Sequence, residues 1–464
     1  MTDDAGSLPP EEADRIRRDH REALLHGWMA QADAKPFIVA GARGVWFWDE
    51  TGKRYLDFAS QLVNANLGHA HPRIVEAIRE QAARLAYVTP TFANDRRGEL
   101  ARRLLEVVPG GLRDGKVFFT TGGAESNEAA LQMARLVTGR QKVITRWNSY
   151  HGATMGARSA GGDPRRLPLE PGVPGTIRAM DPFCYRCPFG LTYPACHLHC
   201  AEPYLRNLIE FEGPDTIAAI MLEPITGSNC RIVPPPEYMP IVRRLCDEYG
   251  ILLILDEVMT GFGRTGEWFC AEHWGISPDI MTLAKGITGG AVPLGAVVVS
   301  RQVAEHFRER ILYTGMTYSG HPLACAAGVA AVRAYAEEGW IENSRELGKT
   351  LMRELTAMKL RHPAIGDVRG VGLFACIELV TDRATRAPLV PWTVANYEKK
   401  HPAVAAVLRQ CLAEGLYTYS RWNMIMLAPP LVISDEELGQ GLEIIDRALG
   451  HADRAVAEAT QSTP

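Results

Sequence analysis

Two short apolar segments, each followed by a charged residue, constrain this chain more than any other feature of its sequence. Residues 251–255 read ILLIL and precede Asp256, and residues 279–284 read DIMTLA and precede Lys285. Continuous apolar runs of this length are typical of strands buried on both faces of a parallel sheet. Because open α/β sheets bind ligands at the carboxyl ends of their strands, the sequence predicts an acid and an amine at a ligand-binding edge.

An acid and an amine placed together have two interpretations. A structural ion pair is the one that the spacing alone favours. The other is a catalytic pair, in which Lys285 forms a Schiff base with pyridoxal phosphate (PLP) and Asp256 keeps the pyridine nitrogen of that cofactor protonated. PLP also requires a phosphate site and an aromatic ring that stacks on the pyridine, so the second interpretation depends on the rest of the chain.

Candidates for both of these parts follow other predicted strands. A Thr-Gly-Gly-Ala turn at residues 121–124 separates a predicted strand, 116–120, from a predicted helix, 125–137. Its free backbone N–H groups meet at a helix N-terminus, where an anion is favoured, although such turns often serve chain geometry alone. Tyr150 follows the predicted strand 143–146 and can stack on a flat ring. A tyrosine of the core is the alternative role for that side chain.

The order of the predicted elements indicates an α/β fold. From about residue 98 onward, strand and helix patterns alternate, which is typical of a mostly parallel sheet flanked by helices. Residues 1–22 are expected to form a loose arm. Strands are also predicted at 217–222 and 294–300, a hairpin within 41–60, a helix at 236–249, two successive helices across 321–358, strands across 366–380, two strands across 416–427, and a final helix at 435–449.

The composition is that of an ordinary globular protein. Of the 464 residues, 46% are hydrophobic and 22% charged, and the formal net charge is -4. Without a basic run, we expect no nucleic-acid partner. The polar, acidic opening MTDDAGSLPPEE is unlike a targeting peptide, and no apolar run reaches membrane-spanning length, so we expect a cytoplasmic protein without a membrane partner. The ten cysteines do not require disulfides in a reducing compartment.

With these features placed, the sequence resembles the class III (ω-) aminotransferases, which are fold-type I PLP enzymes. The resemblance spans about residues 27–449. Seven motifs in this order carry it, and together they are far more specific than any one alone: NLGHAHP (66–72), TTGGAESNEAA (120–130), SYHG (149–152), LEPITG (222–227), DEVMTGFGRTG (256–266), AKGITGG (284–290) and TYSGHPLACAA (317–327).

The resemblance implies a domain arrangement. It is an N-terminal arm with part of a small domain (1–70), a large PLP-binding domain with a mostly parallel sheet (71–335), and a C-terminal segment (336–464) that completes a small α+β domain. It also implies a homodimer, which could pair into a dimer of dimers, because the family's counterpart of Thr317 reaches the phosphate in the neighbouring subunit.

The resemblance also implies roles for single residues. Lys285 matches the Schiff-base lysine that also transfers protons, and Asp256 matches the partner of the pyridine nitrogen. The remaining matches concern cofactor binding. Val258 and Tyr150 match the residues on the two faces of the ring, Gly123 and Ala124 the amides that hold the phosphate, and Glu223 an acid that helps to position cofactor and substrate groups.

Three departures from the family pattern stand out. Ala124 replaces the serine or threonine that is usual in the phosphate turn, so one hydroxyl is lost while the amide remains. Met259 follows Val258 where other side chains are common. The third departure is a segment with Cys184, Cys187, Cys196 and Cys200, interleaved with His197 and His199. Its spacing occurs in zinc sites, but buried thiols or a disulfide explain it equally well, so we assign no metal from the sequence.

The resemblance implies transamination between an amine donor and a 2-oxo acid of the pyruvate or 2-oxoglutarate type, with ping-pong kinetics. Tyr150 is expected to contact the substrate, and Arg421 is the candidate clamp for the substrate carboxylate. A surface arginine is the alternative for Arg421. A PLP-dependent racemase or epimerase, decarboxylase or aminomutase on the same fold is the rival reaction, and a cofactor-free scaffold or regulator is the rival from another class.

Overall fold

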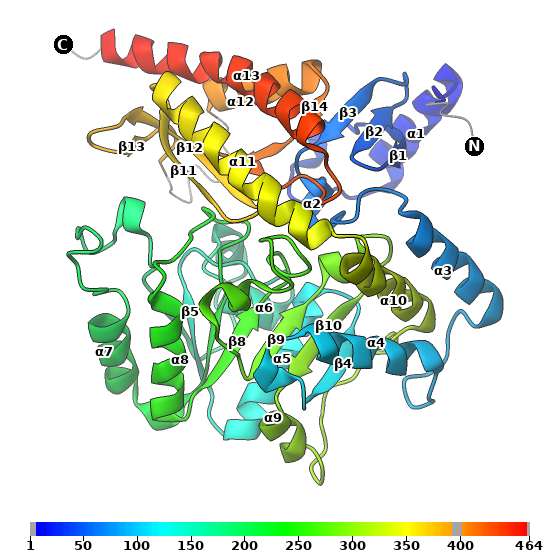
Figure 1. Cartoon of the computed structure of the whole chain (residues 1–464), viewed down its shortest axis with the longest axis vertical. Helices are drawn as coiled ribbons and strands as arrows, with labels where there is room; N and C mark the ends of the chain where they lie inside the picture. Colours follow the sequence, from blue (N-terminus) through cyan, green and yellow to red (C-terminus); the bar gives the residue numbers. More distant parts are fainter. Residues whose placement is uncertain (1–5, 392–400, 462–464) are drawn as a thin grey trace.

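The computed structural model describes residues 6–391 and 401–461. A larger part, built around a seven-stranded sheet, carries a smaller part that contains both ends of the described chain (Figure 1). Among the described residues, no helix is both long and apolar enough to cross a membrane.

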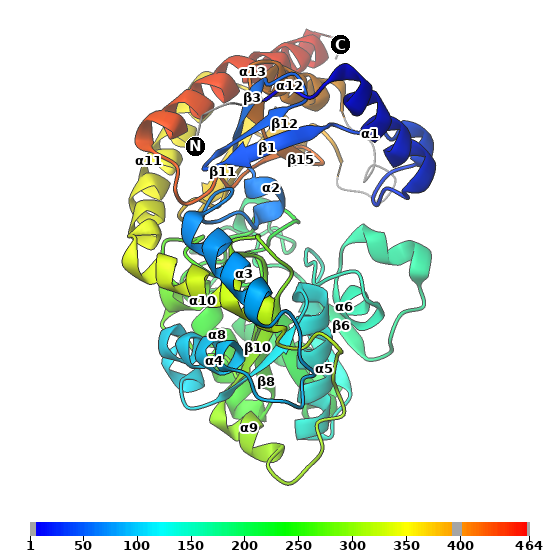
Figure 2. The ribbon, with the colours of Figure 1, turned by 90° about the vertical axis from the view of Figure 1, so that its right-hand side faces the viewer.

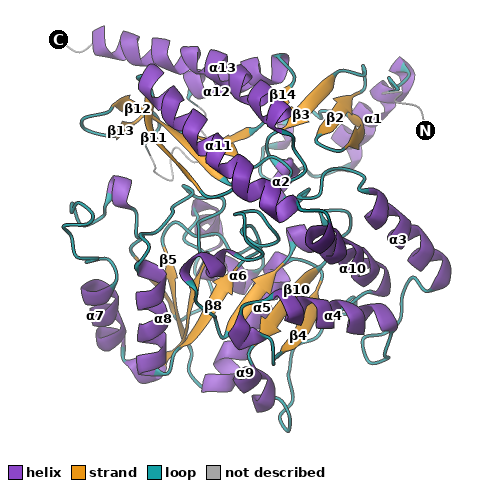
Figure 3. Ribbon diagram, viewed as in Figure 1, coloured by secondary structure: helices purple, strands orange, loops and turns teal. Residues whose placement is uncertain are grey.

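The seven-stranded sheet, whose strands β5, β8, β10 and β4 are labelled in Figure 3, has the order β4-β10-β9-β8-β7-β5-β6. The strands from β9 to β6 are parallel, whereas β10 is antiparallel to both of its neighbours. The mostly parallel sheet expected from the sequence is therefore confirmed. Its strands are β4 (Lys116–Thr120), β5 (Lys142–Arg146), β6 (Thr176–Ala179), β7 (Ile217–Leu222), β8 (Leu252–Asp256), β9 (Ile280–Leu283) and β10 (Gly295–Val299).

Strand β8 lies in the middle of this sheet, and all its residues are buried. Its side chains alternate between two hydrophobic clusters. Leu253 and Leu255 belong to the cluster that includes residues of α8 (Tyr238–Tyr249), and Ile254 to the one that includes residues of α5 (Gly123–Thr138). Burial on both faces is why the segment reads as a continuous apolar run rather than an alternating one.

The other helices of the larger part surround the sheet and connect it to the smaller part. Helices α3 and α10 pack against each other at one side (Figure 2), and α10 also contacts the turn that begins at Lys285. These helices are α3 (Pro72–Arg84), α4 (Asp95–Val107), α6 (Met155–Ala160), α7 (Glu202–Glu212), α9 (Arg301–His306) and α10 (Pro322–Glu337).

The smaller part combines both ends of the chain. Strand β14 (Leu416–Tyr417) pairs in parallel with β3 (Arg54–Asp57), so the C-terminal segment completes a sheet that the N-terminal segment begins. A second sheet has the order β11-β12-β16-β15. Its further elements are β1 (Val39–Arg43), β2 (Trp46–Asp49), α2 (Ser60–Val63), α11 (Trp340–Arg361), β11 (Ile365–Gly370), β12 (Ala375–Asp382), β13 (Ala387–Pro388), α12 (Pro402–Ala413), β15 (Tyr419–Arg421), β16 (Met424–Leu427) and α13 (Asp435–Gln461). The domain boundaries themselves, 1–70, 71–335 and 336–464, stay predictions.

Three expectations about single elements were wrong. The N-terminal arm contains a helix, α1 (Pro10–Ala23), which starts on a proline and carries two acids in its first turn, both favourable at a helix N-terminus. Residues 416–427 form three short strands rather than two, because consecutive residues there pair with different sheets. The last helix runs to Gln461 instead of ending at 449, because its apolar stripe continues through Ala452 and Val456.

Candidate active site

Asp256 ends β8 and is held by three hydrogen bonds. Its Oδ2 atom accepts one from the side-chain amide of Asn127, at 2.8 Å, and lies 2.8 Å from Nδ1 of His151. Its Oδ1 atom accepts from the backbone N–H of Val258, at 3.0 Å. Partners on both oxygens fix the orientation of this buried side chain. The position of Asp256 is therefore set by its neighbours.

The amide of Asn127 is itself fixed by two partners. Its nitrogen donates to the backbone carbonyl of His151, at 2.7 Å, and its oxygen accepts from the Thr282 hydroxyl, at 2.6 Å. Thr282 is a residue of β9, so this network joins α5, β8, β9 and the segment after β5. The sequence analysis missed both Asn127 and His151 as site residues, although they lie within the TTGGAESNEAA and SYHG motifs.

Lys285 lies two residues after the end of β9 and adopts a left-handed backbone conformation, with φ at 47°. Such a φ is uncommon for a residue other than glycine, and conformations of this kind cluster at functional sites. Lys285 lines a cavity of about 260 Å³ together with Gly122, Gly123 and Ala284. The amine and the glycine turn predicted to hold a phosphate therefore share one cavity.

The surroundings of Lys285 lower the pKa of its amine to about 8. Burial is the largest cause, because it disfavours the charged form. The carboxylates of Asp256 and Glu223 raise this pKa, whereas the guanidinium groups of Arg231 and Arg264 lower it. A substantial part of the Lys285 amine is consequently neutral near physiological pH, the form needed for nucleophilic attack and for accepting a proton.

Glu223 follows β7 and is also buried. Its Oε1 accepts from the backbone N–H of Tyr150, at 3.0 Å, and its Oε2 from that of Gly227, at 2.6 Å. Burial raises the pKa of the Glu223 carboxyl, and the Asp256 charge contributes in the same direction. Glu223 thus connects the turn that carries Tyr150 with the loop after β7.

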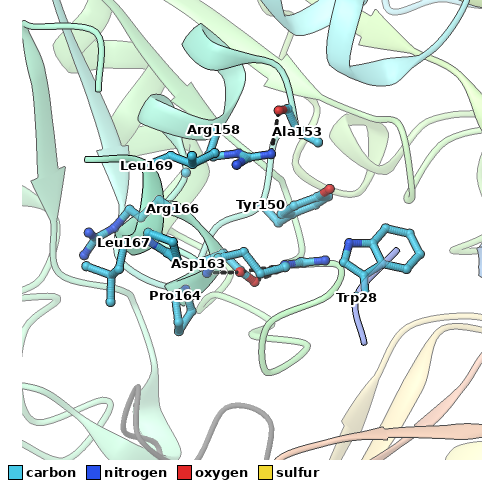
Figure 4. Close-up of a pocket in the computed structure, with 13 residues that line it drawn as sticks. Trp28, Tyr150, Ala153, Arg158, Asp163, Pro164, Arg166, Leu167 and Leu169 are labelled. Carbon is cyan, nitrogen blue, oxygen red and sulfur yellow. Dashed lines mark hydrogen bonds and ion pairs between the residues drawn. The ribbon is translucent and has the colours of Figure 1, made fainter. Parts of the chain in front are cut away.

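Tyr150 lines a second and larger cavity, of about 520 Å³, together with Trp28, Ala153 and Arg158 (Figure 4). The guanidinium of Arg165 lies 3.9 Å from the centre of the Tyr150 ring and is held there by Asp163, with Nε–Oδ1 at 2.7 Å. Although this cavity is the larger one, the candidate site is the cavity of Lys285, since that one contains both the amine and the glycine turn.

The glycine turn is closely packed against its neighbours. A Cβ atom on Gly123 would lie 2.9 Å from the side chain of Val258, so only glycine fits there. The methyl group of Ala124 lies against Gly152, where an added Cβ would come within 2.5 Å of it. The Thr121 hydroxyl, a candidate phosphate donor, instead donates to Glu125, at 2.6 Å. The backbone amides are thus the donors that remain for a phosphate.

Met259, another departure from the family pattern, packs beside the loop after β7. Its sulfur atom lies where a side chain on Gly227 would point, 2.2 Å from the position of such a Cβ. Met259 therefore fills the space beside the Glu223–Gly227 loop, and the glycine there is required by this packing.

Two predicted site residues lie apart from these contacts. Thr317 is exposed, and its backbone carbonyl accepts from the Tyr87 hydroxyl, at 3.0 Å. Arg421 is half-buried at the end of β15, where it pairs with Met424 of β16. Arg421 is not among the main charges that shift the Lys285 pKa. The roles expected of both residues stay predictions.

The structure instead brings Arg231, which the sequence analysis did not select, close to the reactive lysine. Its side chain is fully buried, with the guanidinium carbon 3.4 Å from the ring centre of Phe374. Nη1 donates to the carbonyl of Gly227, at 2.7 Å. Nε and Nη2 have no well-formed hydrogen bond to any described residue, although the Tyr419 hydroxyl is near enough to raise the pKa of the guanidinium.

Arg264 provides a contrast to Arg231. It is equally buried, but it donates to the carbonyl of Leu373, at 3.0 Å, and to the side chain of Asn66, at 2.8 Å. Arg264 therefore connects the two parts of the chain, whereas Arg231 keeps two donor groups available. Arg264 lies within the DEVMTGFGRTG motif, whereas Arg231 lies in none of the seven motifs, so no sequence signal pointed to Arg231.

These residues fit PLP. Gly122 and Gly123 line the same cavity as the Lys285 amine, and the helix N-terminus of α5 offers amides to a phosphate. The carboxyl group of Asp256, oriented by Asn127 and His151, suits a protonated ring nitrogen as its partner.

Comparison with known proteins agrees with this assignment. The sequence profile of the family described as aminotransferase class-III matches residues 29–449. A taurine:2-oxoglutarate aminotransferase from Bifidobacterium kashiwanohense, solved with PLP and glutamate, superposes with a TM-score of 0.89 at 40% identity, over 95% of this chain and 98% of that one.

Two curated relatives match along nearly the whole chain. A leucine/methionine racemase from Thermococcus litoralis is 34% identical over 90% of this chain and 91% of its own length. A putrescine–pyruvate aminotransferase from Pseudomonas aeruginosa is 32% identical over 95% of this chain and 96% of its own length. The chain therefore belongs to the class III aminotransferases, which are PLP-dependent enzymes of fold type I.

Proposed function

We propose that this enzyme moves an amino group from an amine or ω-amino acid donor to a 2-oxo acid of the pyruvate or 2-oxoglutarate type. The observation that carries the proposal is the Lys285 amine, with its pKa lowered to about 8, in one cavity with the Gly123 turn. The names of two similar proteins, a taurine:2-oxoglutarate and a putrescine–pyruvate aminotransferase, support this class of donor and acceptor.

The roles of the site residues follow from their contacts. PLP, when bound, supplies an electron sink for the bonds at the substrate carbon. Asp256, oriented by Asn127 and His151, holds a proton at the ring nitrogen. Lys285 accepts a proton from the substrate carbon at Nζ and returns it on the cofactor side, because a pKa of about 8 suits both directions near neutral pH. We expect Tyr150 and Val258 to cover the two faces of the ring, and Glu223 to hold the backbone of Tyr150 in position.

The acceptor must also be recognised by its carboxylate. We infer that Arg231 does this, because a guanidinium with two donors available matches a carboxylate in charge and geometry. Arg421, expected from the sequence to be the clamp, is the second candidate. Arg231 is favoured because its charge affects the Lys285 amine.

We further infer a homodimer, in which Thr317 of each chain contacts the phosphate bound by the other. The exposed position of Thr317 supports this. A dimer of dimers and a cytoplasmic location, both expected from the sequence, also stay predictions.

A racemase is the second candidate function, because one of the relatives is a leucine/methionine racemase. The two reactions are separated by their products. A transaminase converts added pyruvate or 2-oxoglutarate into alanine or glutamate in the presence of an amine, whereas a racemase changes only the configuration of its amino acid.

The test of the proposal combines activity with a chemical readout. The wild-type enzyme should form the new amino acid and, after borohydride reduction, carry the cofactor covalently on Lys285, as detected by mass spectrometry. Lys285→Ala should do neither, while Lys349→Ala, which changes an exposed lysine, should do both. Near-native turnover of the Lys285→Ala enzyme would contradict the assignment.

A further inference from the structure

A four-cysteine segment lies outside everything that transamination requires. Cys184, Cys187, Cys196 and Cys200 fall between β6 and α7, on a loop that contains one short 3-10 helix, Cys184–Arg186, and no strand. Their spacing is CxxC, eight intervening residues, then CxxxC. All four are free thiols in the structure.

The four side chains line one small cavity. It has room for about one water-sized group, roughly 10 Å³, and its remaining wall is mostly apolar, with Phe189, Leu191 and Leu198. Because all four cysteines line a cavity this small, their sulfur atoms lie near one another in surroundings with little water.

We propose that Cys184, Cys187, Cys196 and Cys200 hold a tetrathiolate metal centre. Four sulfur ligands select zinc or an iron–sulfur cluster over harder metals. When the metal binds, each thiol loses its proton. The positive charge of the metal then offsets the repulsion among the four thiolates, which would be strong in apolar surroundings.

The arrangement of the thiols bears on the kind of centre. No group of three or more His, Cys, Asp or Glu side chains in the described ranges already has the arrangement that a single ion requires. The thiols must therefore either turn inward around a zinc ion or surround a larger iron–sulfur cluster. The imidazole of His199 packs against the Phe189 ring, with centroids 4.9 Å apart, so the sulfur atoms are the ligands we assign.

The position of the segment indicates what the centre would do. Just before it, the carboxylate of Asp181 accepts from the backbone and side-chain N–H groups of Asn148, at 3.0 and 2.9 Å, next to the turn with Tyr150. Within it, Arg186 donates to Glu378 of β12 in the smaller part, at 2.6 Å. A metal centre would thus fix a loop that connects the active-site turn to the smaller part, as a structural element rather than a catalytic one.

The test is metal analysis of the purified holoenzyme, prepared both in air and without oxygen. We expect either about one zinc per chain, or iron and acid-labile sulfide in about equal amounts in the oxygen-free preparation. The first result identifies a zinc site and the second a cluster. Absence of stoichiometric metal from both preparations, with four alkylatable thiols or with disulfides in this segment, would overturn the proposal.

Variants connect the metal to these residues. Cys184→Ala and Cys200→Ala should each lose most of the bound metal and melt several degrees lower, whereas Cys411→Ala, which changes a buried cysteine of α12, should keep its metal. If the Cys184 and Cys200 variants fail to fold, chelation of the wild-type enzyme provides the same comparison through its melting temperature. Full metal content in the Cys184 and Cys200 variants would place the metal elsewhere and contradict the proposal.

Discussion

Replacement of Arg231 by methionine tests how the enzyme recognises its acceptor. Methionine keeps an unbranched side chain against Phe374 but removes the charge and the two donors at Nε and Nη2. A hydrogen bond to a charged group contributes about 1.5–3 kcal/mol, and each 1.4 kcal/mol corresponds to about tenfold in affinity. We therefore expect kcat/KM for the 2-oxo acid half-reaction to fall by roughly 10- to 100-fold.

The assay is single-turnover kinetics of each half-reaction, followed through the absorbance of the cofactor. The half-reaction with a carboxylate-free amine should change little, because that substrate offers Arg231 no partner. Arg421→Met is the matched control and should leave the acceptor half-reaction nearly unchanged. The melting temperature should not fall by more than in that control, since the substitution removes a buried charge that lacks a full set of partners.

The same variant also has an electrostatic consequence. Because the charge of Arg231 lowers the Lys285 pKa, its removal should move that pKa above 8 and shift the pH profile of amine reactivity to higher pH. Equal losses in both half-reactions would make Arg231 a structural residue. A loss confined to the Arg421→Met enzyme would move the carboxylate clamp to Arg421 and refute the reasoning.

The remaining predictions concern the cofactor site and the assembly. Asp256→Asn keeps the shape but removes the charge, so kcat should fall by at least about 10³-fold; steady-state kinetics measure this, and a variant with most of its kcat would show the acid to be structural. In the apoenzyme, labelling of Lys285 by an amine-specific reagent should increase about tenfold per pH unit up to pH 8 and then level off, because the neutral amine reacts; a rise that continues to pH 10 would mean an ordinary lysine. Light scattering at assay concentration should find no active monomer, and a fully active monomer would contradict the shared phosphate site. Thr317→Ala should weaken the binding of the cofactor by roughly tenfold, because the loss of one hydrogen bond to a charged group has about that effect.

Much of the fold could be predicted because its signals are local. Strand β7 was predicted with its observed bounds, and β8 within one residue, since strands buried on both faces are apolar throughout. The weak points were short or exposed elements. The three strands between Leu416 and Leu427 have two to four residues each and are defined by their partners in two different sheets, which no local pattern records.

The site was predictable to the extent that its residues end predicted strands or occupy motifs. Asp256 and Lys285 were found from two apolar runs, and the structure places both in the centre of the larger part. Arg231 could not be found in this way, and Asn127, although it lies in a motif, was not selected. Asn127 looks like any polar residue of a helix, and its role depends on contacts with β8 and β9 that exist only after folding.

The charges around Lys285 explain why one amine can serve both directions of the reaction. Two carboxylates, Asp256 and Glu223, favour its protonated form, while burial and two guanidinium groups, Arg231 and Arg264, favour the neutral form. Burial is the largest of these effects, so the pKa is lowered to about 8, and the loss of one charged partner would shift it. An acceptor carboxylate bound at Arg231 would cancel one of the two positive charges. The Lys285 amine would then become more basic when the acceptor is present, which couples substrate binding to proton transfer through the same arginine.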